Sequence, residues 1–113
     1  MMKVSSPKKQ KRSVSTFGDR LRFVIWLSAY NLGTESGKEL AQVIGKRPDQ
    51  LSKWLKEDPR PEWDNIRLIA ETVGVSALWL DQPESVEAIE PEMWGEWYAK
   101  RQARHAVQER KRA

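Results

Sequence analysis

The chain has 113 residues, a formal net charge of +4 and no cysteine. This length gives room for one small domain with tails, and the lack of cysteine excludes disulfides, thiol chemistry and cysteine-based metal sites. No apolar run approaches the roughly 20 residues that cross a bilayer, and the charged N-terminus lacks the apolar stretch of a secretory signal, so we expect a cytoplasmic protein.

The charge is distributed unevenly along the chain. Residues 1–16 carry a charge of +5, residues 17–83 carry −1, residues 84–99 carry −5 and residues 100–113 carry +5. Basic terminal segments that flank a nearly neutral middle segment are typical of proteins that bind a polyanion, most often nucleic acid. The alternative is that these basic residues only keep the chain soluble.

Residues 1–15 have hardly any large apolar side chains, so we expect a disordered basic arm. A helix should follow, because apolar residues from Phe17 onward recur at helical spacing. Thr16 and Asp19 are placed as a capping pair, and Gly33 ends the helix. The bases of the arm that we expect to contact a polyanion are Lys8, Lys9, Lys11 and Arg12.

Two short helices are expected next. Ser36 and Glu39 have the spacing of a capping box, and Gly45 stops the helix that follows them. Pro48 suits the first turn of the second short helix, which we expect to cover 47–58. The apolar residues of its inner face are Leu51, Trp54 and Leu55.

Two further helices complete the predicted domain, which we place at 16–83. Pro61 marks the start of the first of these helices, and the acidic residues that follow Pro61 favour a helix N-terminus. Gly74 ends this helix. Ser76 then caps a shorter helix.

An acidic linker at 84–90 and a helix over 91–113 with a basic end are expected after the domain. Trp94, Trp97 and Tyr98 are spaced i, i+3 and i+4 in this helix and must bury their faces somewhere. They could pack against the domain itself, or they could form the seam of a homodimer. Because no alternation of period two appears anywhere, we expect an all-α fold.

Ala41, Gly45 and Leu51 have the spacing of a helix-turn-helix, in which a small residue permits close crossing, a glycine opens the turn and an apolar residue fills the crossing point. The surrounding stretches KELAQVIG, LSKWL and RPEWDNIRLIAETVGVSALWL resemble the lambda-type repressor and Cro (XRE-like) family, in particular its short phage-repressor DNA-binding domains. This resemblance covers residues 17–80 and implies a five-helix lambda-repressor-like domain.

The resemblance also implies a function, that of a sequence-specific transcriptional regulator. Such a regulator is expected to be a dimeric repressor, prokaryotic or phage-encoded and nucleoid-associated, that inserts helix 47–58 into the major groove of double-stranded DNA. Carried over by position, the residues that would contact base edges are Arg47, Asp49, Gln50, Ser52 and Lys53. The residues that would contact phosphate are Gly37, Lys38 and Lys56.

Three positions depart from the family pattern. Gly37 stands where the family often has a glutamine that reaches a phosphate, and it offers only its backbone N–H. The Pro48 side chain cannot hydrogen-bond a base, and Asp49 repels phosphate although it could accept from a cytosine amino group. These departures leave an alternative open, a protein-interaction adaptor that keeps the fold without reading DNA.

The sequence contains no pattern that indicates an enzyme. The stretch GTESGK at 33–38 lacks the glycine spacing of a phosphate-binding loop, and Glu39 stands where serine or threonine would hold magnesium. His105 has no second histidine or cysteine with which to share a metal. Too few residues follow Leu80 for the self-cleaving domain of larger phage repressors. We therefore expect no catalysis, no cofactor, no metal and no membrane partner.

Overall fold

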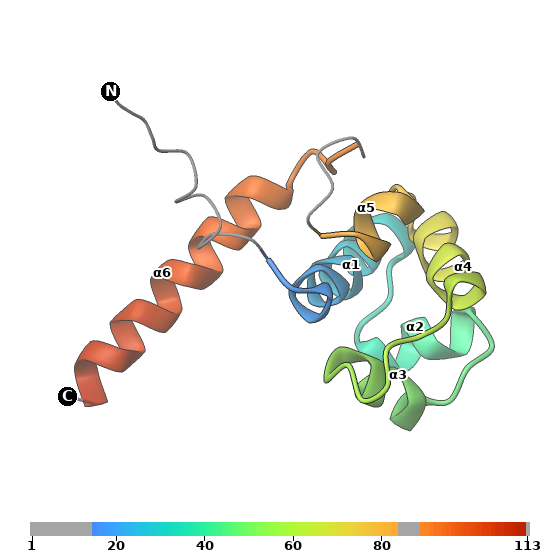
Figure 1. Ribbon diagram of the computed structural model, residues 1–113, viewed down its shortest axis with the longest axis horizontal. Helices are drawn as coiled ribbons and strands as arrows, with labels where there is room; N and C mark the ends of the chain where they lie inside the picture. Colours follow the sequence, from blue (N-terminus) through green and yellow to red (C-terminus); the bar gives the residue numbers. More distant parts are fainter. Residues whose placement is uncertain (1–14, 84–88, 113) are drawn as a thin grey trace.

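The computed structural model describes residues 15–83 and 89–112, and every regular element in these ranges is helical (Figure 1). The all-α fold class is therefore confirmed for this part of the chain. Most of the predicted arm and of the predicted acidic linker lies outside the described residues. The helices are α1 (Phe17–Leu32), α2 (Gly37–Val43), α3 (Pro48–Leu55), α4 (Trp63–Val73), α5 (Ala77–Asp81) and α6 (Trp94–Arg112).

The first helix, α1, has the two ends that the sequence predicts. Asp19 N donates to Thr16 Oγ1 at 3.0 Å, and Thr16 N donates to Asp19 Oδ2 at 3.2 Å, which together form a complete capping box. At the other end Gly33 has a left-handed φ of 75°, and its N–H donates to Ala29 O at 3.1 Å. Glycine adopts this conformation without the steric penalty of a side chain.

The capping box predicted at the start of α2 forms only in part. Glu39 N donates to Ser36 Oγ at 3.4 Å, as predicted. The Glu39 carboxylate, however, accepts from Glu35 N at 2.8 Å rather than from Ser36 N. The return bond is therefore made to the residue before the N-cap, because the Glu39 side chain reaches past Ser36.

The third helix, predicted at 47–58, ends earlier, at Leu55. Glu57 has a left-handed φ of 58°, and Asp58 N turns back to donate to Lys53 O at 3.0 Å. Helices commonly stop at a left-handed residue, but that residue is usually glycine. A glutamate in this role is not a signal that a sequence pattern can reveal.

Two of the three prolines that were predicted to start helices lie before them, whereas Pro48 is the first residue of α3. The fourth helix begins at Trp63 rather than at Pro61, which is buried. The sixth begins at Trp94 rather than at Pro91, and Trp94 N donates to Pro91 O at 3.2 Å.

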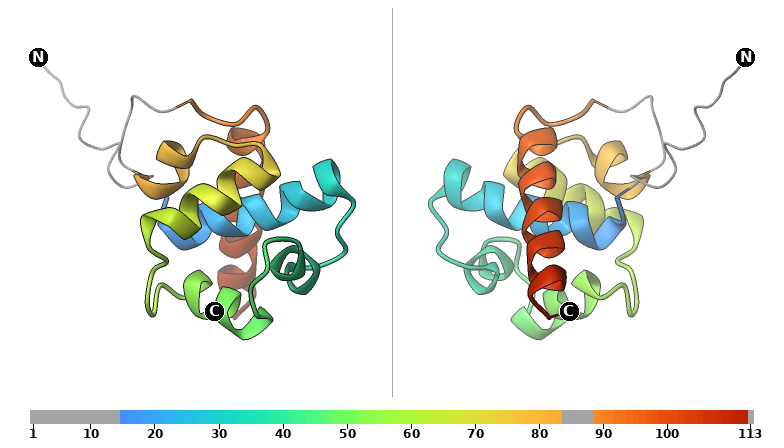
Figure 2. Two further views of the ribbon diagram at one scale, coloured as in Figure 1. Left: turned by 90° about the vertical axis from the view of Figure 1, so that its right-hand side faces the viewer. Right: turned by 90° about the vertical axis from the view of Figure 1, so that its left-hand side faces the viewer.

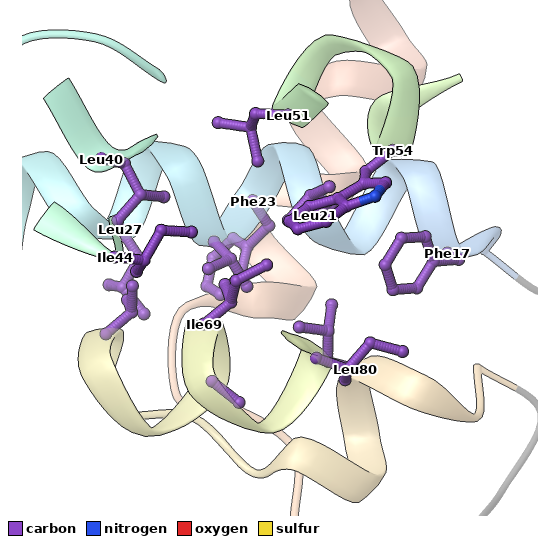
Figure 3. Packing of buried hydrophobic residues seen from close by; sticks show 14 of the residues in the cluster. Phe17, Leu21, Phe23, Leu27, Leu40, Ile44, Leu51, Trp54, Ile69 and Leu80 are labelled. Carbon is purple, nitrogen blue, oxygen red and sulfur yellow. The ribbon is translucent and has the colours of Figure 1, made fainter. Parts of the chain in front are cut away.

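The core surrounds α1, which supplies side chains along most of its length. The other five helices pack around α1 and contribute side chains to the core. In Figure 3 the side chains from α2 to α5 point toward α1. Leu51 and Trp54 of α3 are 2% and 3% exposed, so their predicted place on the inner face is confirmed. The other labelled core residues are Phe17, Leu21, Phe23, Leu27, Leu40, Ile44, Ile69 and Leu80.

The sixth helix crosses the side of α1 and packs there through its first turns (Figure 2). Trp94 is 5% exposed, and its ring centroid lies 5.4 Å from that of Phe23 and 5.1 Å from that of Trp79, both edge to face. Trp97 and Tyr98 are half-buried and stack against Trp94 at 5.7 and 4.8 Å. Packing on the chain's own helices thus accounts for Trp94 and in part for Trp97 and Tyr98, which also pack against the core. A homodimer seam that uses the exposed parts of Trp97 and Tyr98 stays a prediction.

Arg20 connects α1 to the end of α5, a role for which the sequence has no signal. Its Nε donates to Ser15 Oγ at 2.8 Å, and its terminal nitrogens donate to Trp79 O at 2.6 Å and Pro83 O at 2.8 Å. The guanidinium lies 4.5 Å above the Trp79 ring. Burial lowers the pKa of Arg20, and the charge of Glu90 opposes this shift.

Candidate nucleic-acid interface

The turn between α2 and α3 is closed by two backbone hydrogen bonds. Gly45 N donates to Gln42 O at 3.1 Å and Lys46 N donates to Ala41 O at 2.8 Å, the pair of bonds that defines a Schellman motif. Gly45 has a left-handed φ of 75°, and a Cβ added there would meet nothing within 4 Å. The requirement for glycine in this turn is therefore conformational rather than steric.

The crossing of the two helices involves the residues that the sequence pattern indicates. Ala41 is fully buried, and Leu51 is 2% exposed. Leu51 also lies next to the start of α2: a Cβ built on Gly37 would be 3.5 Å from Leu51 Cδ2. These contacts hold α2 and α3 together as one unit, which we call the α2–α3 unit.

The side chains predicted to contact base edges lie on the side of α3 that faces away from the core. This helix is at the edge of the molecule (Figure 1). Its buried core residues are Leu51 and Trp54. Gln50 is half-buried and the rest of this surface is exposed. The exposed residues of the outer face are Arg47, Pro48, Asp49, Ser52, Lys53 and Lys56.

The acidic residue on this face is paired with a base. Arg47 Nε donates to Asp49 Oδ1 at 3.1 Å, with side chains that are 82% and 61% exposed. The hydrogen bond from Arg47 holds the pKa of Asp49 below its usual value. An ion pair this exposed contributes little to stability, so an anionic ligand can compete for Arg47.

The residues predicted to contact phosphate lie at the two ends of the α2–α3 unit. Gly37 is the first residue of α2, with Lys38 exposed beside it, and Lys56 is the C-cap of α3. A Cβ on Gly37 would make only ordinary contacts, at 3.5 Å to Leu51 and 3.7 Å to Ile25. The site therefore has space for a side chain at this position.

A close contact joins the start of α1 to the end of α3. A Cβ built on Gly18 would lie 2.6 Å from Leu55 O, and Gly18 N donates to Glu57 Oε2 at 3.2 Å. Thr16, which leads into α1, is therefore near the C-terminal end of α3. The four predicted contact residues of the arm lie outside the described residues: Lys8, Lys9, Lys11 and Arg12.

Neither a membrane segment nor a metal site is found in the described ranges. None of the helices there has the length and apolar character to span a bilayer. The same residues form no group of three or more His, Cys, Asp or Glu side chains that could hold a metal ion. In comparisons with known proteins, no family model, curated protein or solved structure matches the chain.

Proposed function

We propose that the protein is a sequence-specific DNA-binding transcriptional regulator, built on a five-helix lambda-repressor-like arrangement of α1 to α5. The observation that carries the proposal is the α2–α3 unit. Ala41, Gly45 and Leu51 join its two helices through a buried crossing and a tight turn, while the outer face of α3 is solvent-exposed. An α-helix held in this way fits the major groove, which is about 12 Å wide.

The outer face of α3 carries groups suited to DNA. Lys53 can donate to the O6 and N7 atoms of guanine, and Gln50 can pair with adenine. Ser52 can bond either a base or a phosphate, and Arg47 can leave Asp49 for the same partners. Lys38 and Lys56 lie at the two ends of the α2–α3 unit, and we expect both to contact phosphates.

The regulator would act as a homodimer on a two-fold site and repress by occupying a promoter. Helix-turn-helix proteins bind two half-sites about one helical turn of DNA apart, which requires two copies of the reading helix. Such a regulator would work in the cytoplasm on the nucleoid, without enzymatic activity.

Selection of bound duplexes from a random pool tests the proposal. We expect enrichment of one motif, repeated in two halves, and loss of part of that motif in the Lys53→Ala variant. Arg67→Gln is the matched control, because Arg67 is an exposed base on α4, away from the outer face of α3. A pool that stays random after several rounds would overturn the proposal.

The runner-up is a protein-interaction adaptor. It is favoured by Pro48, which has no side-chain donor, and by the ion pair in which Arg47 and Asp49 satisfy one another. Both features lie at the N-terminal end of α3, the end from which this kind of helix reads bases. An adaptor would bind random and selected duplexes alike, with only the salt dependence that its basic residues impose.

A further inference from the structure

A groove between α1 and α6 is not used by the proposed function. Its larger part has a volume of about 380 Å³ and is lined by Trp26, Met93 and Trp97. A second part of about 370 Å³ also borders Trp26 and Arg101, and it continues along α1 to Gly37 at the start of α2 and Leu55 at the end of α3. We call the two parts together the α1–α6 groove. Of the residues proposed to contact DNA, Gly37 alone lines it.

Two stacked aromatic rings lie exposed beside this groove. Trp26 is 41% exposed and Tyr30 is 70% exposed, and their rings are within 11° of parallel with centroids 6.4 Å apart. Buried Phe23 supports Trp26 from behind at 5.7 Å. Leaving two large rings in water forgoes their hydrophobic stabilisation. A held, exposed ring pair of this kind is a platform on which another planar group can stack.

Basic residues outnumber acidic ones around the groove. Two of the bases have an acidic neighbour. Lys100 Nζ lies 3.4 Å from Glu96 Oε2, and Arg101 Nε lies 3.9 Å from Asp19 Oδ1. Exposed pairs such as that of Lys100 are weak and yield to a stronger partner. The surplus of positive charge favours an anionic occupant. The basic residues that line the groove are Arg22, Lys100, Arg101 and Arg104.

We propose that the α1–α6 groove binds single-stranded nucleic acid across a few nucleotides. Bases stack on Trp26 and Tyr30, while phosphates contact Arg22 and Arg104. Proteins bind single strands by this combination of a basic groove and aromatic rings, because every unpaired base exposes a flat face. Duplex DNA hides those faces within its stack, and an acidic peptide would match the charge without needing two stacked rings.

Binding of fluorescently labelled 12-residue oligothymidylate and oligouridylate to the full chain, followed by anisotropy at low salt, tests the inference. Comparison of the two oligomers distinguishes DNA from RNA as the ligand. We expect Trp26→Ala to weaken binding by roughly five- to hundredfold, the effect of losing stacking on one base, whereas Trp26→Phe keeps most of the affinity. Trp63→Ala should change nothing, since Trp63 on α4 is 45% exposed but lies outside the groove.

The charges are tested in the same assay. Arg104→Gln should lower the slope of log affinity against log salt by about 0.7, the value for one phosphate on a single strand. Arg67→Gln on α4 is the matched control and should leave the slope unchanged. If the Trp26→Ala chain does not fold, Arg104→Gln still decides the question.

Three results would overturn the inference. These are no binding of either oligomer at low salt, equal affinity of the Trp26→Ala and Trp63→Ala chains, and full displacement of the oligomer by an acidic peptide of the same charge. Lys53→Ala should leave single-strand binding intact. This site and the duplex-reading function of α3 can therefore fail independently.

Discussion

Lys53 and Lys56 are exposed lysines only three positions apart, but their places on α3 differ. Lys53 belongs to the helix, on its outer face, whereas Lys56 is the C-cap residue where the chain leaves the helix. We expect Lys53→Ala to relax base preference by about 1–3 kcal/mol at one position of the bound site. Lys56→Ala should weaken binding to all sequences alike. Selection with the Lys53 variant measures the first effect, and titration of the Lys56 variant against several duplexes measures the second. An unchanged motif for the Lys53 variant would remove that residue from base reading.

Gly18 is a buried glycine whose importance comes from a backbone atom far away in the sequence. A Cβ at this position would lie 2.6 Å from Leu55 O, and a main-chain carbonyl cannot move aside as a flexible side chain can. We expect Gly18→Ala to lower the free energy of unfolding by about 1–3 kcal/mol.

Chemical denaturation measures this loss, and Gly95→Ala is its control. A Cβ on Gly95, in α6, would meet nothing within 4 Å, so that variant should gain up to about 1 kcal/mol from the better helix propensity of alanine. Equal stability of the Gly18→Ala chain and the parent chain would show that α1 and α3 can separate without cost.

At the scale of the elements, the α2–α3 unit depends on the conformation of its turn. We expect Gly45→Ala to destabilise the protein by about 1–2 kcal/mol, because an alanine is strained at a φ of 75°. Gly37→Ala should be neutral or slightly stabilising, since Gly37 has no left-handed φ and a Cβ there makes only ordinary contacts. Thermal unfolding of the two variants compares them directly, and a loss of equal size in both would contradict this account of the turn.

Local signals in the sequence were sufficient to predict where most helices lie. The Thr16 cap and the glycines at 33 and 74 gave correct helix limits because their chemistry acts within one turn of the chain. The inner face of α3 was predicted from periodicity alone, and burial of Trp54 confirms it. The base-reading role of the opposite face was predicted from a family resemblance, and it stays a prediction.

Contacts between distant residues could not be predicted in this way. The left-handed Glu57 ends α3, and its carboxylate accepts from Gly18 N at 3.2 Å, so the limit of one helix is coupled to another helix. Arg20 is an arginine in a helical pattern, yet it is buried against Trp79. The α1–α6 groove likewise arises only when α6 packs on α1, and the spacing of the aromatic residues in α6 could not distinguish this packing from a homodimer seam.

At the scale of the whole molecule, α6 completes the core as well as extending beyond it. A chain that ends at Pro83 would expose Phe23 and Trp79, which Trp94 covers in the full chain. We expect this truncation to lower the free energy of unfolding by about 3–5 kcal/mol or more, the loss typical of removing one buried tryptophan. Denaturation measures the loss, and light scattering of the same chain tests the dimer seam. A dimer that persists undiminished would show that Trp97 and Tyr98 do not form it.

The basic arm carries charges that lie outside the described residues. Lys3, Lys8, Lys9, Lys11 and Arg12 precede α1, whose start contacts the C-terminal end of α3. Each phosphate neutralised on duplex DNA changes the slope of log affinity against log salt by about 0.9. If three to five of these bases bind phosphate, removal of residues 2–13 should flatten the slope by roughly 3 to 4 units.

The loss should be greatest at low salt, because the electrostatic contribution is largest there. The selected motif should change little, except for a weaker A·T preference at its edges, since the minor groove distinguishes little else. A full-length chain with the same five bases changed to glutamine separates charge from length, and it should follow the truncated chain at every salt concentration. If the plots of log affinity against log salt coincide for the truncated and full-length chains, the arm serves only solubility.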